Sequence, residues 1–127
     1  MVQSSAEVTV KTTVDPMWIE HCLSTDVFLH SYSGYWAYGF AYDSKLGWLL
    51  FEQGDERRPE KAPRGVMKAW RAGEKLPEGW HRLDVAAATA AWQAGVRRSG
   101  EGWFEDGDGN SYDLALQQAL LGEIRYG

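Results

Sequence analysis

Residues 32–51, YSGYWAYGFAYDSKLGWLLF, hold the highest aromatic density in the chain. Alternation along an extended strand places its large aromatic side chains on one face and its small side chains on the other. The large face consists of Trp36, Tyr38, Phe40 and Tyr42, and the small face of Ala37, Gly39 and Ala41. Because small side chains let a helix, a second copy or a ligand approach the backbone, the small face is a predicted interaction surface.

The same stretch predicts a β-hairpin. Residues 35–43 and 47–53 have strand patterns, and residues 43–47 have the length and composition of a hairpin turn. The second strand is apolar on both faces, which is typical of a central strand. Further extended segments are expected at residues 8–14, 76–83, 102–104 and 124–126.

Helices are predicted between capping residues. Asp15 followed by Pro16 opens a helix over residues 16–23, because Asp caps orphan N–H groups and Pro suits the first helical position. Asp84 caps the helix with the clearest apolar stripe, made of Val85, Thr89, Trp92 and Val96. Other helices are expected at residues 66–72 and 111–121. In the last of these helices Asp113 lies in the first turn, where its negative charge interacts favourably with the helix dipole.

These elements predict a single α+β domain, with helices packed on one face of a small, mostly antiparallel sheet. Residues 1–5 are expected to be a flexible leader and residues 6–127 the domain, since 127 residues is a usual single-domain length. Seven tryptophans indicate an aromatic core. Because each indole N–H needs an acceptor, some of the seven are expected at the edge of the core or at an interface.

Charge and composition exclude several classes of function. A net charge of −5 argues against direct binding of nucleic acid, which depends on Lys and Arg. No apolar run approaches the roughly 20 residues of a membrane span. The single cysteine, Cys22, is expected to be buried and structural, and it fits a reducing compartment. We therefore expect a cytoplasmic protein.

The charges divide into a basic run and an acidic run. The simpler interpretation is that each run forms a solvated surface. The more specific interpretation is that the two runs bind each other in head-to-tail self-association. The basic run is Arg57, Arg58, Lys61, Arg64, Lys68, Arg71 and Lys75, and the acidic run is Glu101, Glu105, Asp106, Asp108 and Asp113.

Each catalytic or metal-binding pattern lacks a required part. Residues 31–34 resemble a hydrolase elbow, but Ser31 stands where that turn needs glycine. His21 and Cys22 are helix neighbours that point about 100° apart, so they cannot share a proton. Residues 106–110 begin like a calcium loop, but Ser111 and Gln117 occupy its two diagnostic positions. No catalytic residue, metal or cofactor is predicted.

Two short motifs carry a family resemblance. They are Ser33-Gly34-Tyr35-Trp36 and the ending Tyr112-Asp113, Gln117, Ala119-Leu120-Leu121-Gly122-Glu123-Ile124, Tyr126-Gly127. With them the chain resembles short uncharacterised phage and prophage proteins, which share a Tyr-Trp step and a closing Ala-Leu-Phe-Gly-Glu element. Leu121 departs from the Phe of that pattern. The resemblance implies a phage-related setting, with the cytoplasm of a bacterial host as the location, and supplies no catalytic residue.

Two functions are weighed. The leading hypothesis is a small phage-type intracellular protein-binding module, an inhibitor of a host defence component such as a CRISPR effector, that also forms a C2 homodimer. Its predicted interaction surface is Tyr35, Ala37, Gly39, Ala41, Arg57, Arg58 and Arg64. The alternative is a small-molecule-binding protein or enzyme, which a buried cavity that holds His30, His81 or Glu52 with a shifted pKa would favour. Its aromatic pocket would be lined by Tyr32, Trp80, His81 and Trp103 and closed by residues 54–65.

Overall fold

The computed structural model describes residues 13–24, 33, 35–53 and 59–126. The predicted leader and residues 8–12 of the predicted first strand lie outside these ranges. In chain order the elements are α1 (Pro16–Leu23), β1 (Ala37–Asp43), β2 (Gly47–Glu52), α2 (Arg64–Ala72), β3 (Trp80–Leu83), α3 (Val85–Ser99), α4 (Trp103–Asp106) and α5 (Gly109–Leu121).

The strands form an antiparallel sheet in the order β1-β2-β3, which confirms the central position of β2. The predicted hairpin turn is also present. The Asp43 carboxylate accepts hydrogen bonds from the backbone N–H groups of Lys45 and Leu46. Gly47 ends the turn with φ +82, and a Cβ there would lie 2.1 Å from the Leu83 carbonyl oxygen. This position therefore requires glycine.

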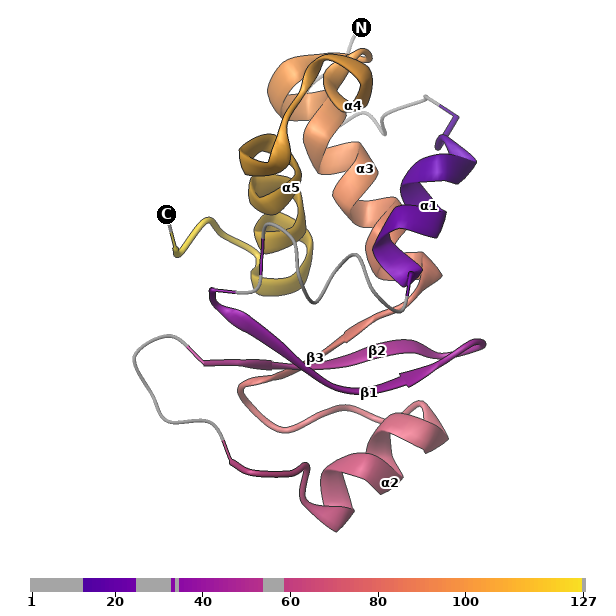
Figure 1. The fold of residues 1–127 in the computed structure, drawn as a ribbon, viewed down its shortest axis with the longest axis vertical. Coiled ribbons are helices and arrows are strands. Elements are labelled where there is room, and N and C mark those ends of the chain that lie inside the picture. Colours follow the sequence, from indigo (N-terminus) through magenta and orange to yellow (C-terminus); the bar gives the residue numbers. More distant parts are fainter. Residues whose placement is uncertain (1–12, 25–32, 34, 54–58, 127) are drawn as a thin grey trace, which may run out of the picture.

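Helices cover both faces of the sheet (Figure 1). α1, α3, α4 and α5 form one layer, and α2 lies alone against the opposite face. The predicted α+β domain with an antiparallel sheet is confirmed. The sequence predicts helices on one face of the sheet, whereas helices cover both faces. The reason lies in β2, where Leu50 packs under the four-helix layer and Leu49 packs against α2.

A β-bulge in β1 breaks the alternation that the sequence predicts. The register shifts between Gly39 and Ala41, so Phe40 is an extra residue relative to β2. As a result Phe40 and Ala41 both pack on the α2 side, whereas Ala37 is buried on the side of the four helices. The expectation of one continuous face of small residues was therefore wrong.

Most predicted helix boundaries are confirmed. Asp15 accepts from Met17 N and Asp84 accepts from Ala87 N, while Gly73 and Gly122 end their helices in the left-handed conformation. α5 begins earlier than expected, because Asp108 is its cap. Among the described residues, no helix has the length and apolar character that crossing a bilayer requires.

The buried side of α3 differs from the predicted stripe. Val85 is 55% exposed, and the buried residues around Trp92 are Ala88, Ala91, Ala94 and Gly95. The reason is close packing. The Trp18 indole of α1 donates to the Ala88 carbonyl oxygen at 2.9 Å, and the Trp103 ring lies over Gly95. Large side chains at these positions would push α1 and α4 away from α3.

Two segments predicted as strands have other structures. The residues around Trp103 form the short helix α4, which turns this indole into the aromatic cluster around Trp18 and Trp92. Residues 124–126 follow α5 without joining the sheet, because their backbone binds a helix side chain described below.

The core buries every tryptophan. All seven are at most 8% exposed, and the most exposed of them, Trp80, lies at the edge of the core, as the sequence predicts for some of them. Cys22 is fully buried, and burial raises the pKa of its thiol well above the ordinary range. The tryptophans therefore belong to the core, and Cys22 is protected from reaction.

We expect Gly95→Ala to destabilise the protein although alanine is the better helix former. A Cβ at this position would lie 2.3 Å from the Trp103 ring, and overpacking of this kind costs about 1–3 kcal/mol. Gly65→Ala in α2 is the control, because its Cβ would meet no atom within 4 Å; it is expected to stabilise by up to about 1 kcal/mol. Urea denaturation measures both values. Equal effects of the two substitutions would contradict the described packing of α4 on α3.

Candidate functional site

A buried carboxyl group on α5 joins the layers of the domain. Asp113 is 2% exposed, and its two oxygens accept four hydrogen bonds. Oδ1 accepts from Ser33 Oγ at 2.6 Å and from Trp36 Nε1 at 2.7 Å. Oδ2 accepts from Tyr35 Oη at 2.6 Å and from Gln117 Nε2 at 3.0 Å. Asp113 therefore holds the chain that enters β1, and it does not serve the helix dipole as predicted.

Gln117, one turn further along α5, fixes the segment that follows the helix. Its Oε1 accepts from the backbone N–H groups of Arg125 and Tyr126, each at 2.8 Å. Its Nε2 donates to the Tyr126 carbonyl oxygen at 2.9 Å as well as to Asp113. These bonds use the backbone groups with which residues 125 and 126 would otherwise join a sheet.

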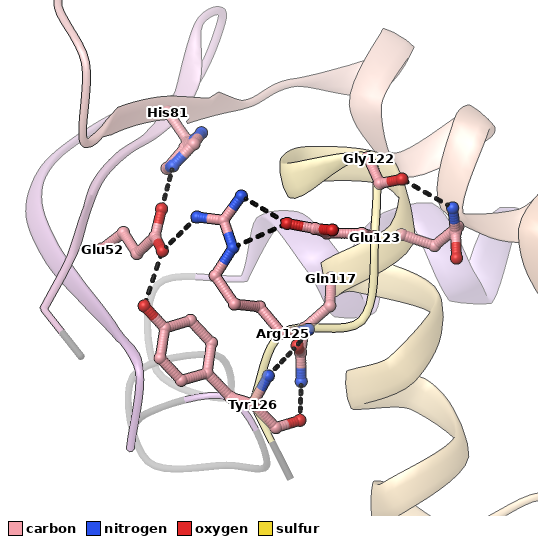
Figure 2. Close-up of polar contacts among 8 residues, drawn as sticks. Glu52, His81, Gln117, Gly122, Glu123, Arg125 and Tyr126 are labelled. Atoms are coloured by element: carbon pink, nitrogen blue, oxygen red, sulfur yellow. Dashed lines mark hydrogen bonds and ion pairs between the residues drawn. The ribbon is translucent and has the colours of Figure 1, made fainter.

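The fixed segment brings two side chains to Glu52 at the end of β2 (Figure 2). Glu52 Oε2 accepts from Arg125 Nη1 at 2.6 Å and from Tyr126 Oη at 2.5 Å. Glu52 Oε1 lies 3.2 Å from His81 Nε2 on the neighbouring strand β3. We call Glu52, His81, Arg125 and Tyr126 the Glu52 cluster.

The electrostatics of the Glu52 cluster favour an ionised carboxylate. Burial by itself raises the pKa of Glu52, but hydrogen bonds from Tyr126, Arg125 and His81 outweigh it, so the pKa lies below its ordinary value. Burial and the hydrogen bond to Glu52 raise the pKa of Tyr126.

Tyr35 is perturbed in the same way in the separate network around Asp113. Burial and the hydrogen bond to Asp113 raise the pKa of Tyr35 to about 12.

The Glu52 cluster lies in one of two adjoining hollows beside β3. The hollow that contains it has a volume of about 550 Å³, and the second has about 400 Å³. His81 lines both hollows. Their other shared lining residues are apolar, namely Leu76, Trp80 and Leu120. The two hollows together form a groove, here called the β3 groove. Its middle is mainly apolar, and the Glu52 cluster lies at one end.

The Glu52 cluster can orient an imidazole and bind polar groups. A carboxylate that contacts His81 is one half of an acid–base arrangement. Among the described residues, no Ser, Cys or Thr lines the β3 groove, and Lys75 is its one lysine. No group of three or more metal-ligating side chains lies together within the described ranges.

The predicted pocket residues separate in the structure. Trp80 and His81 line the β3 groove, and Glu52 joins them there. Trp103 is buried in the four-helix layer against α3 and does not line this groove. Tyr32 and residues 54–58 of the predicted closing loop lie outside the described residues, and the last two residues of that loop, Arg64 and Gly65, belong to α2.

The predicted interaction surface is not one surface. Tyr35 and Arg64 are exposed, Gly39 is partly buried, and Ala37 is only 2% exposed. The bulge places Ala41 on the opposite side of the sheet from Ala37. Arg57 and Arg58 lie outside the described residues. A homodimer through a common small-residue face is therefore not supported by the described strand.

Sequence reasoning missed the main polar residues of the site. Asp113 and Gln117 lie four residues apart on α5, beside the buried Ala115 and Leu116. Polar residues at this spacing on an apolar helix face are a signal of a shared buried network. Arg125 has no comparable signal, because its position depends on backbone bonds to Gln117.

We expect Asp113→Ala to lower the free energy of unfolding by at least about 3 kcal/mol. The substitution leaves several buried donors without an acceptor, and each one costs about 1–3 kcal/mol. Tyr35→Phe, which removes one partly exposed donor, is expected to cost about 1 kcal/mol. Urea denaturation of both variants gives the comparison, and a loss for Asp113→Ala no greater than for Tyr35→Phe would refute the central role of Asp113.

Glu52 is expected to make stability depend on pH below about 4.5, the ordinary pKa of its carboxyl group. The folded pKa is lower, so the unfolded chain binds more protons as the pH falls and the Glu52 contribution is progressively lost. Glu52→Gln should reduce this slope, and Tyr126→Phe should reduce it by less. Urea denaturation between pH 6 and 3 measures the slopes. An unchanged slope in Glu52→Gln would show that the cluster does not bind the ionised form preferentially.

Comparison with known proteins adds no relative to this picture. No protein-family model, curated protein or solved structure matches the chain. The phage resemblance therefore rests on its two short motifs and stays a prediction. The function of the β3 groove is inferred from its geometry alone.

Proposed function

We propose that the protein is a protein-binding module that accepts an extended segment of its partner along the outer edge of β3. The observation that carries this proposal is an unpaired strand edge that opens into the β3 groove. β3 pairs with β2 on one side and with no other strand among the described residues. An extended peptide adds to an edge of this kind by backbone hydrogen bonds.

The register of β2 and β3 identifies the backbone groups on this edge. Glu52 N donates to the Gly79 carbonyl oxygen at 2.8 Å, so these opposite residues form a hydrogen-bonded pair. Bonded and non-bonded pairs alternate in an antiparallel ladder. Arg82 opposite Leu49 is therefore a non-bonded pair, and the Arg82 N–H and C=O groups point to the outer edge.

The space beside this edge has the position of a missing strand. One wall consists of Ala87, Ala119 and Leu120 from the four-helix layer. The opposite wall is formed by residues 73–76, which follow α2. The groove thus lies between the two helical layers, where a fourth strand would continue the sheet. Its apolar residues are suited to bury alternate side chains of a bound segment.

The two outer strands are not equivalent. β1 is the other outer strand among the described residues, but its bulge at Phe40 bends and twists the edge. Bulges of this kind hinder pairing with a further strand. β3 has a continuous register from Trp80 to Leu83. This difference favours β3 as the docking edge.

The nature of the partner is a separate expectation. The phage-related setting and a host defence protein as the partner rest on the sequence resemblance and stay predictions. The β3 groove supports the class of interaction, a protein segment in extended conformation. Its charged end, with Glu52 and Arg125, is suited to bind polar groups of that segment.

A small-molecule-binding function is the second candidate. The hollow at Glu52 has a volume of about 550 Å³, within the usual range of ligand pockets. It also contains a carboxylate whose pKa is lowered. A ligand of this hollow would contact the side chains of the Glu52 cluster and would not need the backbone of Arg82.

A matched pair of substitutions tests the role of the β3 edge. Arg82→Pro removes the outward N–H, whereas Arg82→Ala keeps it. Both variants lose the side-chain bond from Arg82 to the Glu74 carbonyl oxygen. Random peptides selected on the wild-type protein by display are then synthesised, and their affinities are measured by fluorescence anisotropy. We expect Arg82→Pro to bind at least about tenfold more weakly than Arg82→Ala, which corresponds to one strong hydrogen bond.

Thermal unfolding confirms beforehand that both variants are folded, and the difference between them isolates the backbone group. Equal affinities of the two variants, or no enrichment of peptides on the wild-type protein, would overturn the docking edge. A small molecule that binds both variants equally and is lost in Glu52→Gln would support the second candidate in its place.

A further inference from the structure

The outward face of α2 is basic and unpaired. Arg64, Lys68 and Arg71 are spaced by four and three residues, so they share one face of the helix, and Lys61 precedes them. All four are exposed. α2 itself contains no acidic residue, although Glu60 and Glu74 flank it. Within the described ranges, no ion pair involves Lys61, Arg64 or Lys68.

The opposite end of the molecule is acidic. Glu105 and Asp106 lie in α4, and Glu101 and Asp108 lie on either side of it. These four side chains are exposed, and Glu20 on the neighbouring helix α1 adds a further negative charge. Arg97 and Arg98 at the end of α3 offset part of it. The acidic side chains remain in excess at this end.

These two surfaces lie at opposite ends of the long axis of the domain (Figure 1). We propose that the basic face of α2 binds the acidic α4 end of a second copy of this chain, so that copies associate head to tail. The contact joins two different surfaces of the same protein. Such a heterologous contact repeats from copy to copy and produces chains or closed rings.

Charge complementarity selects the second copy over a polyanion as the occupant. A nucleic acid is negatively charged along its whole length, so it would be repelled by the rest of a molecule whose net charge is −5. A second copy has the same net charge, but its acidic side chains gather at the α4 end, where they can contact the basic face directly. The contact is independent of the β3 groove, since none of its eight charged residues lines that groove.

Two charge-reversal variants test the contact. Arg64→Glu with Lys68→Glu cancels the positive charge of the basic face, because Lys61 and Arg71 remain, and it leaves the contact of Arg71 with the Trp70 ring intact. Glu101→Lys with Glu105→Lys cancels the negative charge of the acidic end, because Asp106 and Asp108 remain, and it leaves the Asp108 cap of α5 intact. Sedimentation velocity measures the average mass at low salt over a range of protein concentrations, because screening weakens exposed charge contacts at higher ionic strength.

We expect the wild-type protein to form oligomers at low salt and to return to monomers in 0.5 M NaCl. Each variant alone should stay monomeric, and an equimolar mixture should associate again, because the unchanged acidic end of the first variant can contact the unchanged basic face of the second. A monomeric wild-type protein, an unaffected variant or a mixture that stays monomeric would each overturn the proposal. So would a monomeric wild-type protein that binds a DNA duplex through Arg64 and Lys68, which would assign the basic face to nucleic acid.

Discussion

The buried carboxyl group of Asp113 is the interaction on which the rest of the described structure depends. A buried polar group is tolerated only when its hydrogen bonds are made, and Asp113 has four donors. Three of them come from the segment that enters β1, and the fourth is Gln117 on its own helix. Through Gln117 the same network fixes Arg125 and Tyr126, and these side chains then reach Glu52 on the sheet.

Aromatic packing supplies most of the remaining order. α3 presents alanines and Gly95, so the Trp18 and Trp103 rings lie directly against its backbone. Burying large rings against small residues removes much apolar surface from water and leaves few alternative packings. The indole N–H groups of Trp70, Trp92 and Trp103 have no acceptor among the described residues. The core therefore depends on apolar contact at these positions more than on polar pairing.

Because all seven tryptophans are buried, the candidate binding surfaces are a strand edge and two charged surfaces, and not exposed indole rings. Among the described residues no strand pairs with the outer edge of β3, which lies beside the β3 groove, and the Glu52 cluster lines one end of this groove. The two ends of the long axis carry opposite charge. The β3 groove and the charged ends share no charged residue of the proposed head-to-tail contact, so the two proposed contacts are separate surfaces.

Local chemistry in the sequence was enough to determine the hairpin at Gly47, the central strand and the capped ends of α1 and α3. Turn residues, caps and hydrophobic period act within a few positions of each other, so they can be read without the fold. Of the site, only Glu52, Trp80 and His81 could be named. The bulge at Phe40, the helical conformation of α4 and the position of Arg125 depend on residues distant in the chain. Tertiary structure decided these features, because each one follows from packing or hydrogen bonds that form only when the two helical layers close on the sheet.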